Sequence, residues 1–225
     1  MTSANGTDFR PRTAKPMRSI ALGVLLGAGL VAAGCSGGEP VEDSYSGYVV
    51  DPPLSVAEVA LPDAVSGEEI EMPADPGELR LVYFGFLSCP DVCPTTMSDV
   101  KRALADMEPE DAARVNVGFV TVDPNRDDGE RMVSYLSNFV EDGDVMRTDD
   151  PAALKAAADG FGVGYEVVTN EDGEIEVGHT ADLFAVNSEG TVVMQWPFGT
   201  KAESLSADLT SLLDTEAENA SEGTA

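Results

Sequence analysis

The sequence LRLVYFGFLSCPDVCPTT, residues 79–96, decides the fold class of this chain. Its first half is a near-continuous apolar run broken by Arg80, which predicts a buried strand. Its second half holds Cys89 and Cys93, four residues apart, and leads into an apolar-striped helix that we expect from Pro94 to Met107. A pair of cysteines at a strand-to-helix junction is typical of a redox or metal-binding site.

Strands and helices alternate through the rest of the chain. We expect strands at 115–122, 165–169, 174–178, 181–186 and 191–196. The two strands at 165–178 flank Asn-Glu-Asp-Gly, which is a hairpin signal. Helices are expected after a capping box of Asp127 and Glu130, from Asp150-Pro151 to Gly160, and from about Thr200 to Leu213. This order alone predicts only an α/β domain. The cysteines at the first strand–helix junction make the prediction specific, namely a thioredoxin-like domain with a central mixed β-sheet flanked by helices and an inserted β-hairpin.

Four aromatic residues are assigned to the core rather than to a cofactor site. They are Phe84, Phe86, Trp196 and Phe198.

The first 34 residues have the pattern of a lipoprotein signal peptide. A basic start precedes an uncharged stretch from Ile20 to Ala33, which is too short to cross a hydrocarbon core of about 30 Å comfortably. The small residues before Cys35 form a lipobox in which Ala32 stands where leucine is usual. We therefore expect Cys35 to be lipidated, with the protein anchored to the cell membrane and facing outside the cytoplasm. The alternatives are an uncleaved anchor and a plain signal peptide.

Composition divides the remainder into three parts. Residues 35–52 comprise the lipidated cysteine and a Gly-, Ser-, Pro- and acid-rich flexible tether. We expect residues 53–214 to form one thioredoxin-like domain, which holds the candidate metal site, and residues 215–225 to be a disordered acidic tail.

The net charge excludes one class of partner. The whole chain carries a formal charge of −28, and removal of residues 1–34, with four basic residues and one acidic residue, leaves about −31. Nucleic acid is not an expected ligand, because phosphate binding requires basic patches. Most of these charges are interpreted as a solvated surface, and attraction to cationic partners or metal ions is the alternative.

The cysteines can serve a metal ion, a redox cycle or a structural disulfide. With Cys35 consumed by lipid, Cys89 and Cys93 remain as one pair. A disulfide between them is feasible, but it would close almost no loop and would stabilise the fold little. If Pro94 is the first helical residue, Cys93 occupies the N-cap, where the helix dipole lowers a thiol pKa.

His179 is the chain's single histidine and supplies a third candidate ligand. Two thiolates and one imidazole favour copper, above all Cu(I), with zinc as the competitor. A structural zinc site requires four ligands, and a carboxylate remains available as the fourth.

Three motifs resemble the Sco/SenC family. They are YFGFLSCPDVCPTT at 83–96, VTVDPNRD at 120–127, and His179-Thr180. The resemblance implies a thioredoxin-like domain that binds one copper ion through Cys89, Cys93 and His179. It also implies a role in assembling the CuA centre of cytochrome c oxidase, as copper chaperone, as thiol reductant of the target cysteines, or both. Subunit II of the oxidase would be the partner, together with other copper chaperones or thiol reductants.

Two positions near these motifs leave questions open. Gly178 stands where many family members carry an acid. Asp123 is either a turn residue held by Pro124 or, as the family suggests, a carboxylate near the copper site.

Two other functions compete with copper-dependent assembly. One is a thiol–disulfide oxidoreductase or peroxidase-like enzyme that uses Cys89 and Cys93, and the other is a general copper-handling lipoprotein. His179 separates the first from copper binding, because thiol–disulfide exchange does not need an imidazole.

Overall fold

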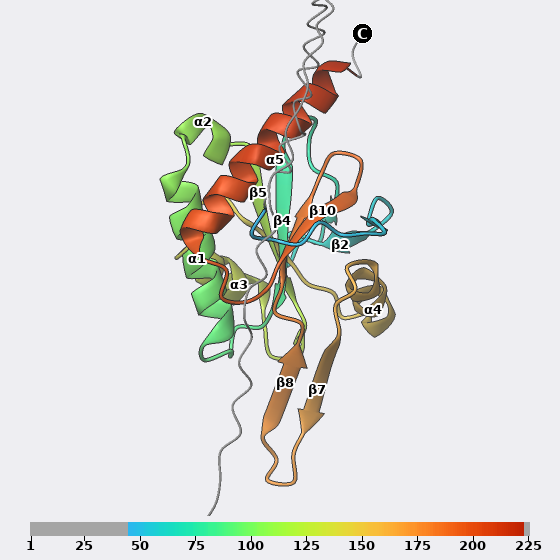
Figure 1. Ribbon diagram of the computed structural model, residues 1–225. Coiled ribbons are helices and arrows are strands. Elements are labelled where there is room, and N and C mark those ends of the chain that lie inside the picture. The colour runs from blue at the N-terminus through green and yellow to red at the C-terminus, as the bar shows by residue number, and fades with distance from the viewer. Residues whose placement is uncertain (1–44, 223–225) are drawn as a thin grey trace, which may run out of the picture. The chain divides into compact units, whose positions relative to one another are not determined.

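A six-stranded mixed sheet forms the centre of the computed structural model, which describes residues 45–222 (Figure 1). In spatial order the strands are β1 (Leu54–Ser55), β10 (Thr191–Trp196), β9 (Leu183–Val186), β4 (Leu79–Gly85), β5 (Val115–Thr121) and β6 (Asp144–Met146). β4, β5 and β6 run parallel to one another, and β9 pairs antiparallel with β4. β10 and β1 extend the sheet by antiparallel pairing. The predicted mixed sheet is confirmed.

Helices cover both faces of this sheet. They are α1 (Val92–Asp106), α2 (Pro109–Ala112), α3 (Gly129–Leu136), α4 (Pro151–Gly160) and α5 (Ala202–Glu222). Figure 1 shows α1 and α5 on one side of the sheet and α4 on the other. The aromatic contacts of β4 agree, because Tyr83 meets Phe119 on one face while Phe84 meets Phe161 after α4. The fold is thioredoxin-like, as predicted.

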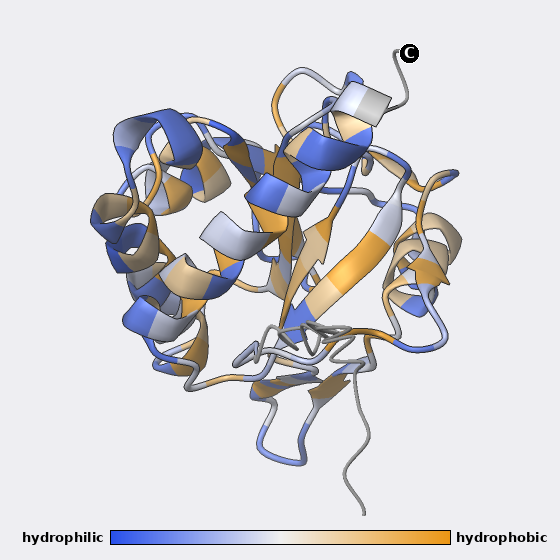
Figure 2. Cartoon of the chain, turned by 45° about the horizontal axis from the view of Figure 1, so that its top comes forward, coloured by the Kyte–Doolittle hydropathy of each residue, from blue (hydrophilic) through white to orange (hydrophobic). Residues whose placement is uncertain are grey.

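The apolar run of β4 lies at the centre of the core. Figure 2 shows the hydrophobic strands inside, with hydrophilic residues on the outer sides of the helices. Arg80, the one charge within the run, forms an ion pair with Asp144 and donates to the Asn116 side chain at 2.9 Å. Gly85 is required by close packing, since a Cβ there would lie 2.9 Å from the Tyr83 ring and 3.0 Å from the Phe119 ring.

The predicted hairpin is confirmed and stands apart from the central sheet. β7 (Tyr165–Thr169) and β8 (Ile175–His179) form their own two-stranded antiparallel sheet and project from the domain (Figure 1). Its turn uses Gly173 at φ 83° and the Asn170 side chain, which accepts the backbone N–H groups of Asp172 and Glu174. A second small sheet pairs β2 (Ala60–Pro62) with β3 (Glu69–Glu71).

The domain is larger than predicted at both ends. Residues 45–52 are not all tether, because Tyr48 exchanges backbone hydrogen bonds with Gln195 of β10. The buried carboxylate of Asp208 accepts the N–H groups of Ser46 and Gly47 and the indole N–H of Trp196. The signal peptide, Cys35 and the tether up to residue 44 lie outside the described residues.

The expectation of a disordered tail is wrong for residues 215–222. Helix α5 continues to Glu222, and Glu216 is buried against the side chain of Asn187. The alanines and glutamates that suggested disorder are also good helix formers, and packing against the domain decides between the two states.

Two smaller expectations are also wrong. Phe198 is 45% exposed, whereas Phe84, Phe86 and Trp196 are buried as predicted. Helix α3 is capped by Asp128, whose side chain accepts the Arg131 N–H, and not by Asp127. Within the part of the chain that the structure describes, no helix is both long and apolar enough to cross a membrane.

Candidate metal centre

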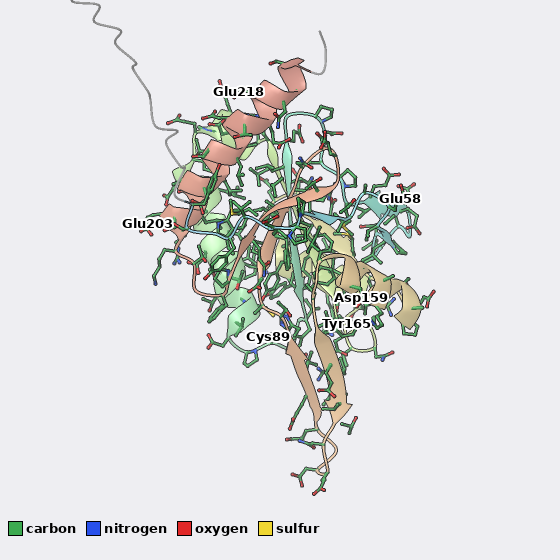
Figure 3. The ribbon with its side chains drawn as sticks, turned by 45° about the vertical axis from the view of Figure 1, so that its right-hand side comes forward. Glu58, Cys89, Asp159, Tyr165, Glu203 and Glu218 are labelled. Atoms are coloured by element: carbon green, nitrogen blue, oxygen red, sulfur yellow. The ribbon has the colours of Figure 1, made fainter. Side chains whose placement is uncertain are left out.

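The three predicted ligand residues lie at one end of the central sheet, at the base of the hairpin. Cys89 lies in the loop after β4, Cys93 is the second residue of α1, and His179 is the last residue of β8. The Cys93 Sγ lies 3.7 Å from the His179 Nε2, and the Cys93 N–H donates to the Cys89 Sγ at 3.3 Å. Figure 3 shows Cys89 near the base of the hairpin, where Tyr165 begins β7.

Cys93 differs from the prediction in position and in acidity. The N-cap of α1 is Asp91, so Cys93 lies inside the first turn, with its side chain fully buried. Burial, reinforced by the neighbouring Cys89, raises the pKa of the Cys93 thiol to about 12. The expected N-cap position and lowered pKa are therefore wrong, because desolvation outweighs the helix terminus.

The sulfur of Cys89 accepts a hydrogen bond from a backbone N–H in the first turn of α1. The first N–H groups of a helix have no intrahelical acceptor, and the N–H of Cys93 finds the sulfur of Cys89. Cys89 is half-buried, whereas Cys93 is inaccessible, and both are free thiols. Cys89 is therefore the sulfur that an incoming molecule can reach.

His179 is held as a neutral imidazole with Nε2 directed at Cys93. Its Nδ1 lies 2.8 Å from the carbonyl oxygen of Thr180, and because a carbonyl only accepts, Nδ1 carries the proton. Burial lowers the pKa of His179, which keeps the ring uncharged near neutral pH. Edge contacts with the rings of Tyr83 and Phe86, at centroid distances of 6.1 and 5.8 Å, fix its orientation. This is the tautomer of a histidine that ligates through Nε2.

The donor set fits a soft metal ion. The 3.7 Å between the Cys93 Sγ and the His179 Nε2 is shorter than the sum of a metal–sulfur bond of about 2.3 Å and a metal–nitrogen bond of about 2.0 Å. One ion can therefore bridge the two atoms. Among residues 45–222, however, no three His, Cys, Asp or Glu side chains are already close enough together to hold an ion. A site with three ligands therefore requires the Cys89 side chain to turn toward the other two.

Asp123 is buried and forms an ion pair with Arg126. Its backbone N–H donates to the hydroxyl of Thr121 at 3.0 Å. These contacts explain Asp123 as a turn residue at the end of β5, and its role near a metal ion stays a prediction.

Asp127 has a role that the sequence interpretation missed. Its carboxylate is buried and accepts the backbone N–H of Leu87 at 3.0 Å and the hydroxyl of Thr121 at 2.7 Å. Burial raises the pKa of this carboxyl group. Asp127 thus ties the cysteine loop to the end of β5. Its place in the quoted motif VTVDPNRD was the available signal, but a capping role was assigned to it instead.

Comparison with known proteins points to one family. The sequence model of the SCO1/SenC family matches residues 64–214. A putative copper-binding protein of Stutzerimonas stutzeri is 28% identical over 140 residues, which cover 62% of this chain and 68% of that protein. Protein SCO2 homolog, mitochondrial, of Homo sapiens is 30% identical over 58% of this chain, and the match covers 49% of its own length. The chain thus spans about half to two thirds of these relatives.

Solved structures agree with the family match. The apo Sco1 protein of Thermus thermophilus is 34% identical, with a TM-score of 0.65 over 76% of this chain and 99% of that chain. The ScoI protein of Bradyrhizobium japonicum, solved with copper bound, is 30% identical, with a TM-score of 0.58 over 71% of this chain and 96% of that chain.

Proposed function

The chain belongs to the SCO1/SenC family, and from that premise we propose that it binds one copper ion through Cys89, Cys93 and His179 and serves assembly of the CuA centre of cytochrome c oxidase. The observation that carries the proposal is the 3.7 Å approach of the Cys93 Sγ to the Nε2 of the chain's single histidine. Redox chemistry at the cysteines alone would not require this imidazole. Copper is the cargo in this account, and subunit II of the oxidase receives it.

Each ligand has a separate task in taking up the ion. Cys89, the accessible sulfur, meets the incoming ion first. The Cys93 thiol is protonated near neutral pH because burial raises its pKa, so metal binding must displace that proton. His179 needs no such step, because its Nε2 already carries a lone pair directed at Cys93.

A second function, reduction of the target's cysteines, is favoured by the unequal exposure of the two thiols. The accessible Cys89, as thiolate, attacks a target disulfide and forms a mixed disulfide while one target sulfur leaves as thiolate. Cys93, after losing its proton, attacks the Cys89 sulfur and releases the second target thiol. The protein ends as the Cys89–Cys93 disulfide, and the target has gained two electrons and two protons.

Substituting His179 distinguishes delivery from reduction. His179→Ala removes one ligand and leaves both thiols in place. If delivery is the essential role, this variant fails to support oxidase activity in a deletion strain but still reduces a disulfide substrate in vitro. Near-normal complementation would instead assign the essential role to reduction. A variant that binds copper as tightly as the wild type would overturn the copper site itself.

We further propose that the protein acts at the outer face of the cell membrane, anchored through lipid on Cys35. The lipobox around Cys35 and the apolar stretch before it support this location. Cys35→Ala should abolish incorporation of a radiolabelled fatty acid and release the protein from the membrane fraction or block signal removal. Unchanged labelling in the variant would contradict the proposal.

A further inference from the structure

Tyr83 places a hydroxyl group in the core without a hydrogen-bond partner. The residue is fully buried in β4, and no group in residues 45–222 forms a hydrogen bond of acceptable geometry with its Oη. Buried polar groups in native proteins are nearly always paired, because desolvation without a partner is costly. An unpaired hydroxyl at this position therefore calls for a functional reason.

The hydroxyl lies beside the buried cysteine. The Tyr83 ring packs against the imidazole of His179 with a centroid distance of 6.1 Å, and the Nε2 of that imidazole lies 3.7 Å from the Cys93 Sγ. The Tyr83 hydroxyl lowers the pKa of the Cys93 thiol, in opposition to burial. Thr96 already donates its own hydroxyl proton to the Val92 carbonyl oxygen at 3.0 Å. The Cys93 thiol faces the His179 Nε2. In this thiol state the sulfur is a weak acceptor, and Tyr83 remains unpaired.

The ring of Tyr83 has little freedom to move its hydroxyl elsewhere. It packs against Phe119 and His179 with centroid distances of 6.0 and 6.1 Å. Its edge also lies over Gly85, where even a Cβ would approach it to 2.9 Å. The surrounding core thus fixes the hydroxyl beside Cys93 before any ion arrives.

We propose that Tyr83 is a positioning residue whose hydroxyl donates a hydrogen bond to the Cys93 sulfur when that sulfur is a metal-bound thiolate. This inference rests on the proposed copper site and adds a residue to it. A thiolate is a much stronger acceptor than a thiol, and a hydrogen bond to a charged acceptor is about twice as strong as a neutral one. The unpaired hydroxyl is tolerated in the metal-free state and becomes satisfied on loading.

Tyr83→Phe tests the proposal, with Tyr135→Phe as the matched control. Tyr135 also buries an unpaired hydroxyl, but its ring packs against Phe119 and Phe139, whereas the ring of Tyr83 packs against His179. Tyr83→Phe should weaken Cu(I) binding by about tenfold, the loss expected for one hydrogen bond to a charged group. It should also shift the sulfur-to-copper charge-transfer band of the Cu(II) form to lower energy, because the sulfur loses a donor. Tyr135→Phe should leave both quantities close to the wild type.

Stability measurements separate positioning from a purely structural role. The reduced, metal-free Tyr83→Phe protein should be as stable as the wild type or more stable, since the variant removes only an unpaired hydroxyl. Its copper-loaded form should be less stable than the loaded wild type. Equal destabilisation of both forms, or equal effects of the two substitutions on copper affinity, would overturn the proposal.

A titration with Cd²⁺, a thiolate-seeking ion with no delivery role, separates failure of the proposed copper function from failure of the role proposed for Tyr83. If the wild type binds Cd²⁺ at the cysteine pair but not Cu(I), the proposed function fails, and the Tyr83→Phe effect on Cd²⁺ affinity alone decides the role of Tyr83. If the wild type binds neither ion, both proposals fail.

Discussion

The candidate site takes its ligands from two regions with very different support. Cys93 lies on α1, packed against the six-stranded sheet and fully buried. His179 ends the β7–β8 hairpin, which forms a separate two-stranded sheet whose Val167, Val168 and Ile175 are each about 40% exposed. A lone hairpin has little stability of its own, whereas buried strands are among the last parts of a protein to open. The sulfur of Cys93 is therefore placed by the core, and the imidazole by a hairpin with far fewer buried apolar side chains.

The pairing register of β7 and β8 determines which face of the hairpin carries His179. Cross-strand partners share a face, so the pairs Tyr165 with His179, Val167 with Val177, and Thr169 with Ile175 all lie on one side. At its base the hairpin is held by a hydrogen bond from the Thr180 N–H to the Gly164 carbonyl. The position of His179 therefore depends on the base of the hairpin, and that of Cys93 on the packing of α1.

The largest expected effect is on Cu(I) affinity, when the ligand from the core, Cys93, or the ligand from the hairpin, His179, is removed. Cys93→Ser should abolish tight Cu(I) binding, because a hydroxyl is a poor ligand for a soft ion. His179→Ala should lower the Cu(I) affinity by at least roughly 10- to 100-fold, which is the loss seen when a residue that merely supports a metal ligand is removed. Two thiolates would remain to hold the ion. Competition titrations with a Cu(I) chelator measure both affinities. Equal losses of Cu(I) affinity would show that Cys93 and His179 contribute equally to binding the ion.

A valine pair compares the packing of the two regions. Val82→Ala in β4 deletes fully buried methyl groups and should lower the free energy of unfolding by about 2 kcal/mol. Val167→Ala in β7 makes the same chemical change at a 40% exposed position and should cost less than about 0.5 kcal/mol. Urea denaturation of the reduced proteins supplies the two values. A cost at Val167 near that at Val82 would mean that the hairpin is as firmly packed as the core.

The smallest effect is a pH dependence from His179. Burial lowers its folded pKa, so as the pH falls below about 6.5 the unfolded chain takes up a proton that the folded chain resists. The free energy of unfolding should therefore fall across that window and level off below the folded pKa. Asp127 and Glu216 act in the opposite direction, because burial raises the pKa of each.

The contribution of His179 is the difference between the pH profiles of the wild type and His179→Ala, each measured without metal. If the two profiles run parallel, the imidazole is not held neutral by burial.

Long apolar runs and turn residues explain most of the fold that could be predicted. β10 and β7 have the predicted bounds, and β5 ends one residue before its predicted end. β1, β2, β3 and β6 were missed, because strands of two or three residues are too short to show a periodic pattern. The start of α1 was misplaced by two residues, since Pro94 is equally acceptable later in the first turn, where its missing N–H is not needed.

The site was predictable in its residues but not in its electrostatics. Cys89 and Cys93 stand in a specific motif, and His179 has no competitor in the sequence. The raised pKa of Cys93 depends on how deeply α1 packs, which a helix-terminus argument cannot reveal. The neighbours of Tyr83 and Asp127 likewise depend on how β4 packs and on the path of the loop between β5 and α3.

X-ray absorption of the reduced protein loaded with one equivalent of Cu(I) tests the central claim most directly. The measurement is best made on the Cys35→Ala variant, so that Cys89 and Cys93 are the only thiols. The account predicts a copper ion bound by two sulfurs and one nitrogen, with the nitrogen contribution lost in His179→Ala. A wild-type spectrum with sulfur ligands alone, unchanged by that substitution, would contradict it.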